Sequence, residues 1–158
     1  MNASMSELKQ VFENAGFADV RTVLGSGNVV FNAREKSCAA IERKAEAQMK
    51  KDLGRAFLTI VRSNDDLAKL MKADPFKAYK IPGSAKKVVT FLRSTPSAWP
   101  EFPIEKDGAV VAGAQGSHVF THYVAHPKGP TFMVLIEKLF GTEVTTRTWG
   151  TVRKCAIA

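Results

Sequence analysis

The sequence predicts an α+β protein made of two ferredoxin-like (split βαβ) halves with antiparallel sheets. Three observations support this prediction. Runs of β-branched and apolar residues occur in pairs separated by short glycine-containing turns, which is typical of hairpins. Segments with apolar residues at helical spacing lie between these pairs. The resulting order, αββαβα and then βββαβα, fits two split βαβ units in succession, the first of which is missing its opening strand.

The first helix and hairpin have clear local signals. Ser4 and Glu7 form a capping box, which predicts a helix over residues 5–15 that ends at Gly16. A hairpin over residues 19–32 follows, because two β-like runs flank Gly25-Ser26-Gly27-Asn28. Glycine and asparagine accept positive φ, and serine and asparagine bond to nearby backbone, so these residues form a turn.

The rest of the first half is predicted to be helix, strand, helix. Ser37 caps a helix over residues 38–51, whose charged side chains, Glu42 among them, are expected on a solvated face. Residues 57–61 have the composition of a strand. A box-like pattern from Ser63 starts a third helix, which ends before Pro75 because the residue before proline avoids the α region.

The second half begins with a strongly apolar strand, residues 86–92. Three prolines between residues 95 and 103 exclude a regular helix there, and Trp99 and Phe102 are expected to anchor this loop. The remaining predicted elements are a hairpin of 109–112 with 118–124 across 113–116, a helix over 132–140 capped by Thr131 and ended by Gly141, a strand over 142–148, and a short helix over 152–157.

Composition limits the class of protein. The 158 residues suit one domain, and we predict a single domain, 1–158, made of two half-units of about 1–74 and 84–158. The net charge of +8 is compatible with nucleic acid, acidic lipid or anionic metabolites as partners. Cys38 and Cys155 form no CxxC motif and are expected to be reduced thiols. No signal segment or membrane-length apolar run is visible, so we expect a cytoplasmic protein.

The best candidate site combines the hairpin turn with the end of the chain. Its predicted ligand-binding residues are Arg21, Ser26, Gly27, Asn28, Arg147, Trp149, Thr151 and Arg153. In the functional interpretation, the turn amides form an anion-receptive concavity, an arginine fork binds phosphate or carboxylate, and the tryptophan stacks on a ring. In the alternative interpretation the turn is only a tight turn, Trp149 belongs to the core, Arg147 pairs with an acid, and Thr151 caps a helix.

Other chemistries have weaker support. His118 and His122 would share a strand face but lie roughly 13 Å apart along it, so no metal is expected. The sequence has no nucleophile elbow, P-loop, GxGxxG or carboxylate pair, and no cofactor is predicted. These observations favour a non-catalytic domain that binds a small anion or nucleotide. A nucleic-acid-associated basic protein and an enzyme of unknown class are the alternatives.

Two separated motifs resemble a known family. They are Ser26-Gly27-Asn28-Val29-Val30-Phe31, after Gly16-Phe17 and Val20-Arg21-Thr22, and the closing run from Thr145 to Lys154. In this combination the whole chain resembles the bacterial domain of unknown function 1697 (DUF1697) family. The resemblance implies two ferredoxin-like halves and no assigned activity. The chain departs from the family pattern at Thr148, where asparagine is usual, and in having no strand and Gly-rich loop before the first helix.

The missing strand has a physical consequence. The first strand of a ferredoxin-like sheet is central, so its loss leaves neighbouring strand edges unpaired, and such edges recruit other chains. The chain is then an abbreviated product, a neighbouring strand closes the gap, or a partner donates one. A homodimer through an unpaired sheet edge is therefore one of the expected partners, beside a small anionic ligand.

Overall fold

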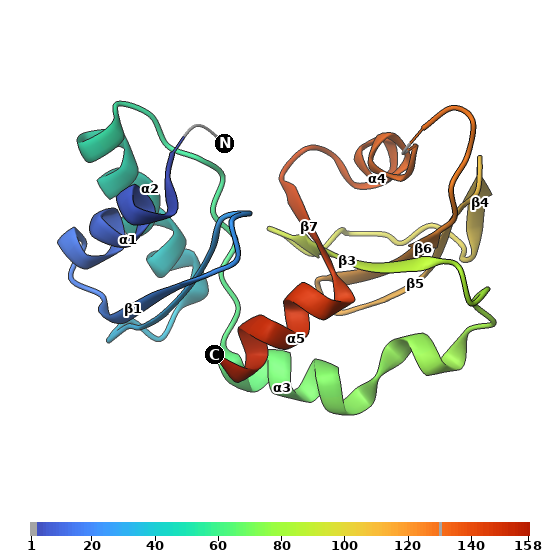
Figure 1. Cartoon of the computed structure of the whole chain (residues 1–158), viewed down its shortest axis with the longest axis horizontal. Coiled ribbons are helices and arrows are strands. Elements are labelled where there is room, and N and C mark those ends of the chain that lie inside the picture. The colour runs from blue at the N-terminus through green and yellow to red at the C-terminus, as the bar shows by residue number, and fades with distance from the viewer. Residues whose placement is uncertain (1–2, 130) are drawn as a thin grey trace. The chain divides into compact units, whose positions relative to one another are not determined.

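The computed structural model describes residues 3–129 and 131–158 and has an α+β fold with two antiparallel sheets, which confirms the predicted fold class. The chain divides into two compact units, Met1–Ala68 with Arg153–Ala158, and Lys69–Val152. Figure 1 shows their elements. In chain order these are α1 (Met5–Asn14), β1 (Ala18–Val23), β2 (Asn28–Asn32), α2 (Cys38–Leu53), α3 (Asn64–Ala73), the 3-10 helix η1 (Pro75–Ala78), β3 (Lys86–Leu92), β4 (Ile104–Lys106), β5 (Ala109–Gln115), β6 (His118–Tyr123), α4 (Phe132–Phe140), β7 (Val144–Thr148) and α5 (Trp149–Ile157).

Local signals set the helices of the first unit. The Ser4 hydroxyl accepts from the Glu7 amide at 3.1 Å and the Glu7 carboxylate accepts from the Ser4 amide at 3.2 Å, which confirms the capping box. Gly16, at φ +95°, follows the end of α1 in the left-handed conformation. Ser37 caps α2 by accepting from the Ala40 amide at 3.3 Å. Both predicted helices are therefore confirmed, although α2 continues to Leu53.

The core of the first unit lies between its hairpin and its helices. Strands β1 and β2 form an antiparallel pair, and α1 and α2 lie together beside it (Figure 1). The buried residues of this core are Leu8, Val11, Phe12, Ala15, Phe17, Val20, Ile41, Ala45 and Met49. Within the described residues, β2 has a strand partner on one side only, which is β1.

Two predictions for the first unit were wrong, and they are connected. Residues 57–61 form no strand, and Glu42 is buried, with 5% of its surface exposed. The Glu42 carboxylate accepts from the Val61 amide at 2.8 Å, and the Glu46 carboxylate accepts from the Thr59 amide at 2.9 Å. Strand propensity needs a neighbouring strand to be realised. Here two carboxylates of α2, one helical turn apart, accept the hydrogen bonds that carbonyl groups of such a strand would accept.

The second unit contains a five-stranded sheet with the order β4-β5-β6-β3-β7. Omitting the edge strand β4, this is the order of a split βαβ unit, in which β3 lies between β6 and β7, the two strands that α4 connects. The proline-rich loop stands where the first helix of such a unit would be, as the sequence predicted. The three-residue strand β4 was not predicted, because Ile104, Glu105 and Lys106 have no recognisable period.

The sheet of the second unit is covered on both faces (Figure 1). On one face α4 buries Leu135 and Ile136 against strand residues that include Leu92, Val111 and Val119. On the other face η1 places Phe76 edge-on against Phe120 and Trp149, at ring-centroid distances of 5.7 and 5.2 Å. Each face is therefore fixed by a helix, and strand alternation decides which side chains meet which helix.

Two predicted boundaries and one predicted cap in the second unit were corrected. Strand β5 runs through Gly113 to Gln115, so the hairpin turn is shorter than predicted. Helix α5 begins at Trp149, three residues early, because Thr148 acts as its N-terminal cap. Thr131 precedes α4 but makes no side-chain capping bond, since its hydroxyl bonds elsewhere.

Candidate functional site

The second unit has a pocket of about 360 Å³ beside the outer strand β7. It is bounded by the start of α4, by strands β6 and β3, and by the whole length of β7. The lining residues are Val88, Tyr123, Phe132, Met133, Val144, Thr145, Thr146, Arg147 and Thr148. The volume lies at the lower end of the range for small-molecule sites, about 300–1,000 Å³, so the pocket suits a small ligand.

One end of the pocket is apolar and aromatic. The rings of Tyr123 and Phe132 stack with centroids 4.3 Å apart and an interplanar angle of 15°. Met133 follows Phe132 in the first turn of α4 and lines the same pocket. Val88, which is buried and lies opposite Thr148, and Val144, at the start of β7, add apolar surface along the pocket. The aromatic side chains provide surface for a flat, apolar part of a ligand.

The other side of the pocket is the threonine-rich strand β7. In the antiparallel register, Thr146 lies opposite Thr90 and Thr148 lies opposite Val88, so these side chains share the α4 face of the sheet. The Thr146 and Thr90 hydroxyl groups bond to each other at 2.7 Å. The Thr148 hydroxyl accepts from the Thr151 amide at 3.3 Å. Hydroxyl groups held in this way present hydrogen-bonding atoms at fixed positions.

Arg147 is the cationic residue among the nine that line the pocket, and none of the nine is acidic. Its Nη1 donates to the Thr145 hydroxyl and to the Thr146 carbonyl oxygen, both at 2.9 Å. In the antiparallel register Arg147 lies opposite Val89, so its side chain leaves β7 on the face of Phe120. The bonds to Thr145 and Thr146 hold the planar guanidinium at β7, which is the outermost strand of the sheet. Of the residues predicted from sequence to bind a ligand, Arg147 is the one that lines this pocket.

The predicted residues near the chain end have different environments. Trp149 is buried, with 8% of its surface exposed, and packs edge-on against Phe76, so it has the position that core packing would give it. The Thr151 hydroxyl bonds to the Thr148 hydroxyl at 3.0 Å, in the first turn of α5. Arg153 is exposed and belongs to the first unit.

The predicted turn residues all lie in the first unit, and its own atoms organise them. The Asn28 amide group donates to the Val23 carbonyl oxygen at 3.0 Å and to the Ser26 hydroxyl at 2.9 Å. Gly27 has φ +91°, which explains a glycine at this position. Arg21 donates to the Ala158 carbonyl oxygen at 3.4 Å. The two Asn28 bonds close the turn, and ligand binding by these residues stays a prediction.

Most residues that line the pocket were not predicted from the sequence to bind a ligand. Tyr123, Phe132 and Met133 had been assigned only to a strand and an apolar helix, and the threonines of β7 only to a strand. The broad apolar surface of residues 132–140 was a usable signal. One face of such a helix packs on the sheet, and a second apolar face remains available to line a pocket or an interface. The pairing of β7 with β3, which brings Val88 to the same pocket, has no sequence signal.

Among titratable groups in the second unit, His122 has the clearest perturbation. Burial lowers the pKa of His122 below its ordinary value, and the nearby Glu105 carboxylate opposes this effect. His122 lies on the sheet face opposite the pocket, with Phe120. Within the described ranges, no group of three or more potential metal ligands occurs. No helix in the described part of the chain combines the length and apolar character needed to cross a bilayer.

Fold and pocket together define an α+β protein with a split βαβ sheet and a small pocket beside its outer strand. The chain belongs to the family described as "Protein of unknown function (DUF1697)", whose model matches residues 1–120. The terminal motif, residues 145–154, lies beyond that match. The family assignment therefore rests on the first unit and on the sheet up to β6.

A solved structure has a similar fold. It is described as that of the conserved bacterial protein SP0830 from Streptococcus pneumoniae, and it has a TM-score of 0.65 and 17% sequence identity over 99% of this chain and 88% of that chain. At this identity the similarity shows the fold alone. No curated protein matches the sequence.

Proposed function

We propose that the protein is a non-catalytic binding domain for a small anionic ligand of the nucleotide class, held in the pocket of the second unit. The observation that carries this proposal is the pairing, in one 360 Å³ pocket, of an aromatic end with a threonine- and arginine-bearing strand. A ligand with a flat ring and an anionic group matches both ends.

The apolar end suits a ring because Tyr123, Phe132 and Met133 offer polarisable surface with few polar atoms. The volume restricts the ligand to about the size of a mononucleotide or smaller. The pocket is open to a phosphate at β7, where the Thr146 and Thr148 hydroxyl groups lie on the pocket face.

The anionic group is the part of the ligand that Arg147 would recognise, at the outer edge of β7 where both faces of the strand are within reach. Its guanidinium is planar and always charged, and its bonds to Thr145 and Thr146 orient it before a ligand arrives. The amide groups at the start of α5, next to Thr148, add a positive potential. This charge arrangement favours phosphate or carboxylate over a neutral group.

The direct test is calorimetric titration of the protein with AMP, adenosine and inorganic phosphate. We expect AMP to bind more tightly than either fragment, because it engages both ends of the pocket. Arg147→Ala should weaken AMP binding by about tenfold or more, since a hydrogen bond to a charged group contributes about 1.5–3 kcal/mol. Arg147→Lys should restore little of it, because lysine keeps the charge and loses the planar fork.

The matched control is Lys138→Ala. Lys138 is exposed on α4, in the same unit, and does not line the pocket. Lys138→Ala removes one positive charge, as Arg147→Ala does. Because Lys138 lies outside the pocket, AMP affinity should stay at the wild-type value. Equal losses of AMP affinity in the two alanine variants would show that net charge, and not the position of Arg147, explains the effect. Absence of AMP binding by the wild-type protein would reject the proposal.

Two further predictions keep the status of proposals. The first is a cytoplasmic location in a bacterial cell, for which the bacterial source of the solved structure with a similar fold is the support. A homodimer through a sheet edge is supported by β2, which within the described residues pairs only with β1 and whose five residues carry no charge. Analytical ultracentrifugation over a wide concentration range tests the dimer, and a monomer throughout would reject it.

A further inference from the structure

A second polar cluster in the same unit joins the β4–β5 turn to the connection before α4. Asp107 and Gly108 form this turn, with φ values of +49° and +83°. Two consecutive positive φ values define the turn type that suits a two-residue hairpin, and Asp-Gly is a favoured sequence for it. Asp107 is thus at a position that tolerates few residues, and its side chain direction is fixed by the turn.

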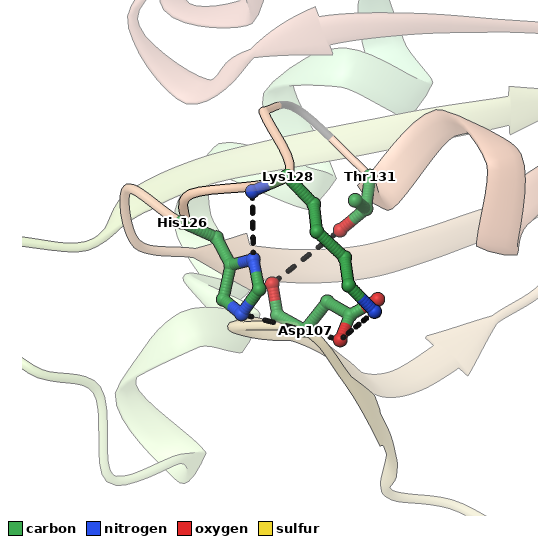
Figure 2. Close-up of polar contacts among 4 residues, drawn as sticks. All are labelled: Asp107, His126, Lys128 and Thr131. Carbon is green, nitrogen blue, oxygen red and sulfur yellow. Dashed lines mark hydrogen bonds and ion pairs between the residues drawn. The ribbon is translucent and has the colours of Figure 1, made fainter.

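Asp107 contacts the connection between β6 and α4 at three points (Figure 2). Its carboxylate lies 4.0 Å from His126 Nε2 and 3.6 Å from Lys128 Nζ. Its carbonyl oxygen accepts from the Thr131 hydroxyl at 3.4 Å. The Lys128 side chain is 68% exposed, so solvent screens its contact with the carboxylate.

The connection is also bonded within itself and to the neighbouring turn residue. His126 Nδ1 accepts from the Lys128 amide at 3.2 Å (Figure 2), and the His126 carbonyl oxygen accepts from the Gly129 amide at 2.9 Å. The Gly108 carbonyl oxygen accepts from the Val124 amide at 3.0 Å. The turn therefore holds both ends of the described connection between β6 and α4.

The residue before α4 makes an unusual contact with this turn. Thr131 is the N-cap residue, where a threonine hydroxyl ordinarily accepts from an amide of the first turn. Here the hydroxyl makes no capping bond and instead donates to Asp107. The next two residues, Phe132 and Met133, line the ligand pocket, and Phe132 stacks on Tyr123.

We propose that Asp107 is a positioning residue for the pocket. Its carboxylate, beside His126, and its backbone carbonyl oxygen, which accepts from Thr131, set where α4 begins and so where Phe132 and Met133 stand. This role rests on the ligand site proposed above. Asp107 does not line the pocket, so it acts on ligand affinity only through the position of the aromatic wall.

Two variants test the role without removing the turn. Asp107→Asn keeps a residue that tolerates positive φ and removes the carboxylate charge. Thr131→Val keeps the shape of the side chain and removes the hydroxyl, and no capping bond is lost with it. The matched control is Glu101→Gln, an exposed residue of the same unit that loses the same charge.

Three measurements are compared: hydrogen exchange of peptides covering residues 124–134, AMP affinity, and melting temperature. We expect Thr131→Val to exchange faster in that segment by about fivefold or more, which corresponds to the loss of one hydrogen bond. Asp107→Asn keeps that bond, because the backbone carbonyl oxygen accepts it, and should exchange faster because the carboxylate contacts with His126 and Lys128 are weakened. AMP affinity should fall by a similar factor, with a melting temperature equal to that of the control. A merely structural role would lower the melting temperature and leave affinity unchanged.

Exchange and affinity equal to those of Glu101→Gln would overturn the proposal, and so would faster exchange with unchanged affinity. Failure of the proposed ligand site would give a different result from failure of the Asp107 proposal. In that case the wild-type protein binds neither AMP nor phosphate, which removes the role in binding, while the exchange data still decide whether Asp107 holds the connection.

Discussion

At the residue scale, the departures from prediction follow from partners that a linear pattern cannot show. Glu42 occurs in a run of charged residues and was expected in solvent, yet it is buried because the Val61 amide needs an acceptor. Trp149 was ambiguous between stacking and core, and its contact with Phe76 comes from a residue 73 positions earlier. In contrast, Ser4, Glu7 and Ser37 were predicted correctly, since their partners lie within three residues.

Glu42 provides a direct stability prediction. Glu42→Ala should lower the free energy of unfolding by about 1–3 kcal/mol, because the partly buried Val61 amide loses its acceptor. Glu42→Gln should cost less, since the side-chain carbonyl oxygen can still accept. Urea denaturation of both variants, with the exposed Glu13→Gln as control, measures the difference. Equal costs for alanine and glutamine would show that the acceptor is not what Glu42 provides.

His122 provides a prediction about pH. Burial lowers the pKa of His122 in the folded state, so the unfolded chain binds a proton more readily than the folded protein does. The stabilising effect of a neutral His122 is complete above the unfolded value of about 6.5 and is lost as pH falls below it. Unfolding free energies at a series of pH values should show this loss in the wild-type protein and less of it in His122→Gln. An unchanged pH dependence in the variant would contradict the assignment.

At the scale of elements, the helices and hairpins were largely predictable because capping, turn chemistry and apolar spacing are local. Strand pairing was not, since it depends on which segments meet. Residues 57–61 have strand composition and no strand neighbour, and β4 has little strand composition and a partner in β5. The pocket could not be predicted from the sequence for the same reason, because it requires β7 to pair with β3 and α4 to pack on the same face of the sheet.

One contact between elements of the second unit is unusually close. A methyl group added at Gly113 of β5 would overlap the Tyr79 hydroxyl group. Gly113→Ala should therefore destabilise the protein by about 1–3 kcal/mol, the usual cost of overpacking. Tyr79→Phe in the same chain should recover part of that loss, because it removes the overlapping oxygen. Thermal unfolding of the two single variants and the double variant tests this, and strictly additive effects would contradict a direct contact.

At the scale of the whole molecule, the net charge of +8 allows binding to nucleic acid without any specific site. Such binding is dominated by counterion release and weakens steeply as salt is raised. We expect fluorescence anisotropy with a short single-stranded RNA to show a steep salt dependence of this kind. AMP binding in the pocket should change much less over the same salt range, and an equally steep dependence would indicate that surface charge, not the pocket, binds the nucleotide.

The central claim is that a small anionic ligand occupies the pocket of the second unit. Methyl NMR of the methionine residues tests it most directly, because Met133 lines the pocket and Met49 is buried in the core of the first unit. Assignment of the Met133 signal follows from Met133→Leu. On titration with AMP, the account predicts a saturable shift of the Met133 methyl signal and no change at Met49. An unmoved Met133 signal at AMP concentrations that saturate binding would contradict it.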